Sequence, residues 1–169
     1  MEAKNTFSRQ KIIKPMRIII RPARREEWDD AMALAWRTFM KFEAEDYTDK
    51  GIKNFQDFIT DPMLHRMFDM GAYRLFAAYD NDKIVGMISL RNDTHISLLF
   101  VDEKYHKMGI GRMLMNYLCQ YVVEEGYNLV TVNAAPYAVE FYHRVGFIDA
   151  GKEEFSDGII YTPMKRIIG

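Results

Sequence analysis

The chain has 169 residues, 49% of them hydrophobic and 28% charged, which is the composition of one globular domain with a sizeable core and excludes general disorder. With 23 Lys+Arg against 24 Asp+Glu, the net charge of −1 argues against a nucleic-acid partner or an anionic membrane surface. The single cysteine, Cys119, cannot form an internal disulfide, and the four histidines have no close ligand spacing. We therefore expect no metal and a reducing, cytoplasmic compartment.

The first fifteen residues are polar and basic. They contain no apolar run long enough for a signal peptide, and the chain has no stretch near the ~20 apolar residues of a membrane span. Pro15 separates this segment from the β-branched run Arg17 to Arg21. We expect a flexible extension over residues 1–15, a single soluble domain over 16–169, and no membrane partner.

Hydrophobic periodicity predicts a mixture of helices and strands. In chain order these are a strand at 17–21, a helix at 26–41, short helices near 51–59 and 62–70, strands at 73–79, 83–90 and 95–101, a helix at 112–125, a strand at 129–132, a helix at 136–145, and strands at 152–155 and 159–165. The turn-forming triplets at 80–82 and 156–158 each separate two strands, which indicates two hairpins.

A basic turn with two glycines connects the strand ending at Val101 to the next helix. Gly109 and Gly111 let the backbone approach a ligand and align successive N–H groups, while the helix N-terminus adds its positive dipole. Lys107 and Arg112 add side-chain charge. The pattern predicts an anion site, although a Gly-x-Gly motif alone is equally compatible with a tight connection and a solvated basic face.

Two other phosphate motifs are not satisfied. In a dinucleotide-binding fingerprint the third glycine would stand at Leu114, and the next strand ends in Asn133 rather than an acidic residue. The segment 146–152 has most of a P-loop, but Glu153 replaces the Ser or Thr that binds Mg²⁺ and a strand follows where a helix is required.

Two motifs, in order and joined by a helix and a strand of suitable length, resemble those of the GCN5-related N-acetyltransferases (GNAT family). They are Leu99-x-Val101 followed by His106-x-x-Gly109-x-Gly111, and Ala138-Val-Glu-Phe-Tyr142-His-Arg-Val-Gly146-Phe147. The resemblance covers most of residues 17–166. The chain departs from the family at His106, where Gln or Arg is usual, and at Ala135, where Asn is frequent and contacts the cofactor.

The resemblance implies an α+β fold with a mixed, mostly antiparallel, twisted sheet of six or seven strands and about four flanking helices. It also implies acetyl-CoA as co-substrate and no metal, with the pyrophosphate on residues 107–112 and the pantetheine arm paired to the backbone of 99–101. The residues expected to contact acetyl-CoA are Leu99, Phe100, Val101, Lys107, Met108, Gly109, Ile110, Gly111 and Arg112. Backbone N–H groups near Phe100 and Val101 would stabilise the developing oxyanion.

Two residues are candidates for proton transfer. Tyr142 matches the tyrosine that protonates the departing CoA thiolate in many family members; the alternative is a core tyrosine packed on Phe147. His95 stands where some relatives carry a catalytic glutamate, and period-two alternation places it on the strand face of Ser97, Leu99 and Val101. An imidazole suits a general base near neutral pH. The alternatives are a plain surface histidine, or a local bulge that turns the ring away. If the base lies elsewhere, Glu43 and Glu45 are the next candidates.

Family architecture places the segment after the first long helix and the last hairpin around the acceptor. Here that segment mixes acids with aromatic residues, which can attract a protonated amine and hold it against rings: Phe42, Glu43, Glu45, Asp46, Tyr47, Phe55 and Phe58. The expected function is acetyl transfer from acetyl-CoA to an amine of a small molecule or peptide by direct attack in a ternary complex. The alternative is a non-catalytic acyl-CoA-binding or regulatory module on the same fold, and a homodimer is left open.

Overall fold

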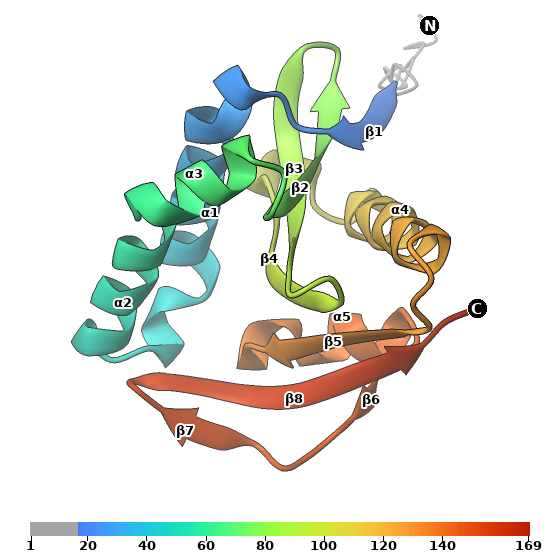
Figure 1. Cartoon of the computed structure of the whole chain (residues 1–169). Helices are drawn as coiled ribbons and strands as arrows, with labels where there is room; N and C mark the ends of the chain where they lie inside the picture. Colours follow the sequence, from blue (N-terminus) through green and yellow to red (C-terminus); the bar gives the residue numbers. More distant parts are fainter. Residues whose placement is uncertain (1–16) are drawn as a thin grey trace, which may run out of the picture.

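The computed structural model describes residues 17–169, so the predicted extension at 1–15 lies outside the described part of the chain. Helices and strands follow one another in the order shown in Figure 1, with η marking a 3-10 helix. They are β1 (Ile18–Pro22), η1 (Arg25–Glu27), α1 (Trp28–Phe42), η2 (Ala44–Asp46), α2 (Asp49–Ile59), α3 (Pro62–Asp69), β2 (Arg74–Asp80), β3 (Lys83–Arg91), β4 (His95–Val101), η3 (Glu103–Tyr105), α4 (Ile110–Glu124), β5 (Leu129–Ala134), η4 (Pro136–Ala138), α5 (Val139–Arg144), β6 (Ile148–Asp149), β7 (Glu154–Ser156) and β8 (Ile159–Ile167).

The strands form one sheet in the order β1-β2-β3-β4-β5-β8-β6, and β7 pairs with β8 beside this path. Every pairing is antiparallel except that of β4 with β5. This arrangement confirms the predicted mixed, mostly antiparallel α+β fold. Strand β6 was not expected from the sequence, because two residues are too few to show a period.

Helices cover both faces of the sheet, so the domain has two hydrophobic cores. On one face, Ala31, Ala35 and Phe39 of α1 are fully buried at four-residue spacing and pack with residues of β3 and β4. On the other face, Leu114 and Leu118 of α4 are fully buried against β2, β3 and β5. These helical stripes fix α1 and α4 on opposite sides of β4 (Figure 1).

Strands β4 and β5 pair over only two positions, His95 with Thr131 and Ile96 with Val132. On its other side, β5 pairs with β8 along its whole length. Figure 1 shows β5 and β8 running crosswise to β2, β3 and β4. Among the described residues, the backbone of 97–101 therefore has no sheet partner on its β5 side.

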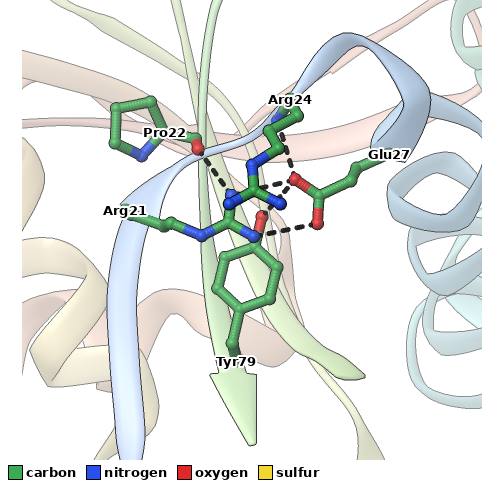
Figure 2. A network of polar contacts seen from close by, with 5 residues as sticks. All are labelled: Arg21, Pro22, Arg24, Glu27 and Tyr79. Carbon is green, nitrogen blue, oxygen red and sulfur yellow. Dashed lines mark hydrogen bonds and ion pairs between the residues drawn. The ribbon is translucent and has the colours of Figure 1, made fainter. Parts of the chain in front are cut away.

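A polar network, drawn in Figure 2, fastens β1 to β2 and to the start of α1. The Glu27 carboxylate accepts hydrogen bonds from the Arg21 guanidinium at 2.9 and 3.2 Å, from the Arg24 backbone N–H at 2.8 Å and from the Tyr79 hydroxyl at 3.0 Å. Burial opposes ionisation of Glu27, but the hydrogen bonds outweigh it and lower its pKa. The network therefore stays charged at neutral pH and supports the edge of the sheet.

Candidate active site

The parting of β4 from β5 opens a cleft of about 1270 Å³. Its walls come from β4, the turn before α4, the β5 to α5 segment, the end of α1, α2, and the β7–β8 hairpin. Most of the residues expected at the site line this cleft: His95, Leu99, Phe100, Val101, Lys107, Gly109, Ile110, Gly111, Arg112 and Tyr142. Met108 does not line it and is 49% exposed.

The turn before α4 has the backbone shape of an anion cradle. Lys107 and Gly109 both adopt left-handed conformations, with φ of 60° and 81°, and Gly109 is the N-cap of the 15-residue helix α4. A Cβ added at Gly109 would meet no atom within 4 Å, so the space beside it is open. Left-handed turns at a helix start direct N–H groups at an anion, and Lys107 and Arg112 add positive charge. These features fit a pyrophosphate.

Gly111 has a different structural reason to be glycine. A Cβ at this position would lie 3.1 and 3.2 Å from the ring carbons Cε2 and Cζ of Phe141. Gly111 therefore permits the close approach of α4 and α5, whereas the Gly-x-Gly pattern predicted only the approach of a ligand. It still lines the cleft, at the junction of the cradle and α5.

His106 occupies the position where the family usually has Gln or Arg, and it holds the end of β4. Its Nε2 donates a hydrogen bond to the Val101 carbonyl oxygen at 2.7 Å, while the Asp102 N–H donates to Val85 O of β3 at 2.8 Å. The His106 ring also packs on Phe42 with centroids 4.9 Å apart. One backbone acceptor of the segment expected to pair with pantetheine is thus already engaged.

A β-bulge interrupts β4 at Ser97. Ser89 of β3 is opposite Leu98, but the next residue, Leu90, is opposite Ile96, so Ser97 is an extra residue. The bulge shifts the alternation of side chains between the two faces. Ile96 packs in the core beneath α4, whereas Leu98 packs in the core beneath α1.

Because of the bulge, His95 does not share a face of the sheet with Leu99 and Val101, contrary to the prediction. Leu99 and Val101 contact the same core as Ile96, so they lie on the face opposite His95, which instead shares the face of Thr131. Period-two alternation was wrong here because it assumes a strand without an extra residue. His95 Nδ1 lies 2.8 Å from Thr131 Oγ1, and burial, with the charge of Arg91, lowers the imidazole pKa.

Tyr142 is packed in the core and also reaches the cleft. Only 4% of the residue is exposed, and its ring makes edge contacts with Phe141 and Phe147 at centroid distances of 5.5 and 5.2 Å. It nevertheless lines the cleft. Burial, followed by the negative charge of Glu43, raises the pKa of the phenol, which therefore keeps its proton at physiological pH.

Glu43 is the most perturbed acid of the site. It follows α1 as the C-cap residue, lines the cleft, and has its pKa raised to about 7 by burial and by the neighbouring charge of Asp46. Its charge acts on Tyr142 and Tyr137, whose pKa values rise chiefly through burial and additionally through Glu43. The sequence named Glu43 and Glu45 as the next candidate bases but had no signal that distinguishes one from the other; of the two, only Glu43 lines the cleft.

Aromatic and polar side chains of the predicted acceptor segment also line the cleft. Of the predicted acceptor residues, Phe42, Glu43, Tyr47, Phe55 and Phe58 line it, whereas Glu45 and Asp46 do not. The β7–β8 hairpin contributes Asp157 and Tyr161 from the opposite wall. A hydrogen bond of 3.1 Å from Thr48 N–H to Gly158 O joins the two walls.

Within residues 17–169, no group of three or more His, Cys, Asp or Glu side chains is arranged to hold a metal ion. In the same part of the chain, no helix has both the length and the apolar character needed to cross a membrane.

Residues 43–168 match the family model described as Acetyltransferase (GNAT) domain, which spans more than half of the chain. The protein therefore belongs to the GNAT acetyltransferase family. Membership supports acyl transfer as its general class of chemistry.

Solved structures share the fold at low sequence identity. A GCN5-related N-acetyltransferase from Rhodopseudomonas palustris has 22% identity and a TM-score of 0.77, over 89% of this chain and 95% of that one. PaiA N-acetyltransferase from Thermoplasma acidophilum, solved in complex with coenzyme A, has 18% identity and a TM-score of 0.73, over 90% and 99%. A GNAT-family acetyltransferase from Staphylococcus aureus Mu50 has 18% identity and a TM-score of 0.69, over 90% and 99%.

Proposed function

We propose that the protein is an N-acetyltransferase that moves an acetyl group from acetyl-CoA to an amine of a small molecule or peptide by direct attack in a ternary complex. The observation that carries the proposal is one continuous cleft that joins three features: the unpaired side of β4, the left-handed turn at the start of α4, and the buried phenol of Tyr142. The free side of β4 suits the pantetheine arm with its thioester, the left-handed turn suits the pyrophosphate anion, and the Tyr142 phenol can donate a proton.

Residues 107–112 would hold the pyrophosphate, because their N–H groups and positive charges lie at a helix start. The free side of β4 at residues 99–101 would hold the pantetheine arm as an added strand. Ala135 offers no polar side chain for a further contact, so the backbone carries the recognition in this part of the cleft. Bound acetyl-CoA supplies an activated acetyl group as its thioester.

In the proposed reaction the acceptor nitrogen bonds to the acetyl carbon, and the bond from that carbon to sulfur breaks. Backbone N–H groups near Phe100 and Val101 stabilise the negative charge that develops on the acetyl oxygen. Tyr142 donates its proton to the departing thiolate, and a base takes the proton that the amine loses. Return of that proton to Tyr142 through solvent completes the cycle, with an amide and CoA thiol as products.

His95 is the proposed base. If its Nδ1–H donates to Thr131 Oγ1, Nε2 is left without a proton and is free to accept one. Glu43 is the competing base, since it lines the same cleft and has a pKa near neutrality. Both side chains line the cleft in which the proposed amine would bind.

An acceptor screen tests the proposal. Purified protein is incubated with acetyl-CoA and a panel of primary amines, N-terminal peptides and hydroxyl analogues, and the release of CoA thiol is measured. We expect release that depends on an added amine and falls in Tyr142→Phe. Binding of acetyl-CoA without amine-dependent release across the panel would favour the non-catalytic acyl-CoA-binding module instead.

A further inference from the structure

Three hydroxyl groups meet at the bulge of β4. The Tyr73 hydroxyl lies 2.7 Å from Ser89 Oγ and 3.0 Å from Ser97 Oγ. Tyr73 and Ser89 are buried, at 1% and 0% exposure, whereas Ser97 lines the cleft. Tyr73 is held from the other side by an edge contact with Trp28, centroid to centroid 6.1 Å. The row of hydroxyls thus runs from the core to the cleft.

Each hydroxyl has one hydrogen to donate, which fixes the donor and the acceptor in each hydrogen bond of the row. The single phenolic hydrogen of Tyr73 is donated to Ser97 Oγ. Ser89 must therefore be the donor in its contact with the Tyr73 oxygen. Ser97 accepts from Tyr73 and keeps its own hydrogen, which is available for donation into the cleft. Successive hydrogen bonds in one direction polarise one another, so the terminal O–H is a stronger donor than an isolated serine.

The row is unsuited to carrying protons away from the site. It ends at Ser89, which has no exposed surface, and burial raises the pKa of Tyr73 so that the phenol keeps its proton. A relay needs a titrating group or solvent at its far end. What the arrangement provides is a fixed orientation for Ser97 at the point where β4 leaves β5.

We propose that Ser97 donates a hydrogen bond to the carbonyl oxygen of the acetyl group bound in the cleft, and that Tyr73 and Ser89 are positioning residues for this donor. The inference rests on the proposed function, because it requires acetyl-CoA to lie along β4. Ser97 lies three residues before Phe100 on β4, roughly 10 Å away along the strand, so its hydroxyl would serve the acetyl oxygen at the bulge in place of the backbone N–H groups near Phe100 and Val101. Its contribution grows as negative charge develops.

Isotope-edited infrared spectroscopy tests the hydrogen bond without relying on turnover. Acetyl-CoA labelled with ¹³C at the carbonyl is bound to the wild type and to Ser97→Ala, and the thioester carbonyl stretch is compared at saturation. A donated hydrogen bond lowers this frequency, so we expect a lower band in the wild type than in Ser97→Ala. Ser97→Thr keeps a hydroxyl and should stay near the wild type. Tyr73→Phe keeps Ser97 but loses its orientation, so its band should fall between the two.

Ser156→Ala is the matched control, because Ser156 also lines the cleft but lies on the β7–β8 hairpin. Its band should equal that of the wild type. Where an acceptor is known, Ser97→Ala should lower kcat on the order of 10²-fold, with little change in acetyl-CoA affinity.

Identical carbonyl bands in the wild type and a folded Ser97→Ala overturn the proposal. If Ser97→Ala does not fold, a Tyr73→Phe band equal to that of the wild type overturns it instead. Failure of the wild type to bind acetyl-CoA would contradict the proposed function itself, so the two failures are distinguishable.

Discussion

Tyr142 is both a packed core residue and the proton donor of the proposed mechanism. Its ring fills the core between Phe141 and Phe147, and the resulting burial is the main reason that its pKa is raised. A raised pKa keeps the phenol neutral throughout the range in which enzymes are assayed. The proton that the proposed mechanism needs is therefore always present on Tyr142.

Replacing Tyr142 with Phe should retain the ring contacts and remove only this proton. We expect turnover to fall at least tenfold, since general acid catalysis is typically worth ~10² to 10⁴ in rate, with little change in acetyl-CoA affinity. Steady-state kinetics with calorimetric titration of acetyl-CoA checks both. Tyr137→Phe is the control in the same cleft. Wild-type turnover in a folded Tyr142→Phe would assign the phenol to packing alone.

The pH profile separates the two candidate bases. Burial raises the pKa of Glu43 to about 7, whereas burial and Arg91 lower the pKa of His95 below its ordinary 6.5. Each accepts a proton only in its deprotonated form, which predominates above its own pKa. With His95 as base, we expect kcat/KM to rise with pH along a limb centred below 6.5, and His95→Gln to remove that limb and lower kcat/KM about 10²-fold.

Glu43→Gln is the matched variant for this profile. It should leave the limb in place if His95 is the base. A limb centred near pH 7 that disappears in Glu43→Gln and persists in His95→Gln would transfer the role to Glu43.

At the scale of elements, the approach of α4 to α5 sets the shape of the cradle. Gly111 on α4 faces the ring of Phe141 on α5, which would have to shift by a few tenths of an ångström to admit a Cβ, and Tyr142 is the next residue along α5. The same contact therefore positions the start of α4 and the proposed proton donor. Displacing one element from the other should disturb both functions.

Gly111→Ala should lower stability by about 1 to 3 kcal/mol through overpacking, and should weaken acetyl-CoA binding by shifting α4. Phe141→Leu in the same chain removes ring atoms and should restore part of both losses. Chemical denaturation and titration of acetyl-CoA across the double-mutant cycle measure the coupling.

Gly109→Ala is the control for this cycle. A Cβ there meets no neighbour but must adopt a left-handed φ of 81°, so we expect a backbone cost of roughly 1 to 2 kcal/mol that Phe141→Leu does not relieve. Purely additive losses in Gly111→Ala and Phe141→Leu would contradict a direct contact between α4 and α5.

At the scale of the whole molecule, the cleft divides the sheet where its pairing is weakest. Only two residue pairs join β4 to β5, whereas β5 and β8 pair along the length of β5. A ligand that contacts β4, the turn before α4, and α5 would therefore connect two parts of the sheet that share few direct hydrogen bonds. Such a ligand should stabilise the domain as a whole.

Acetyl-CoA should raise the melting temperature. At a concentration of 100 Kd, binding to the folded state alone adds about 2.7 kcal/mol, which corresponds to roughly 5 to 10 °C for a domain of this size. Differential scanning fluorimetry measures the shift, with adenosine, which lacks the pyrophosphate, as the control ligand. An equal shift with adenosine would contradict the assignment of the pyrophosphate to residues 107–112.

Local patterns in the sequence were sufficient for most elements of the fold. The β-branched and alternating runs predicted β1 to β5 and β8, and the four-residue spacing of apolar side chains predicted α1 and α4, because these periods arise from the geometry of one element at a time. The two motifs that resemble the GNAT family likewise consist of short contiguous segments. They predicted the glycine-containing turn before α4 and named Tyr142 as a candidate proton donor.

Tertiary structure alone decided the finer geometry of the site. The extra residue at Ser97 reversed the face of Leu99 and Val101 relative to His95, since a bulge depends on how β3 and β4 pair rather than on the period of either. The contact of Gly111 with Phe141 likewise joins residues distant in sequence. The raised pKa of Glu43 follows from burial, which exists only once the chain has folded around it and which no spacing of residues encodes.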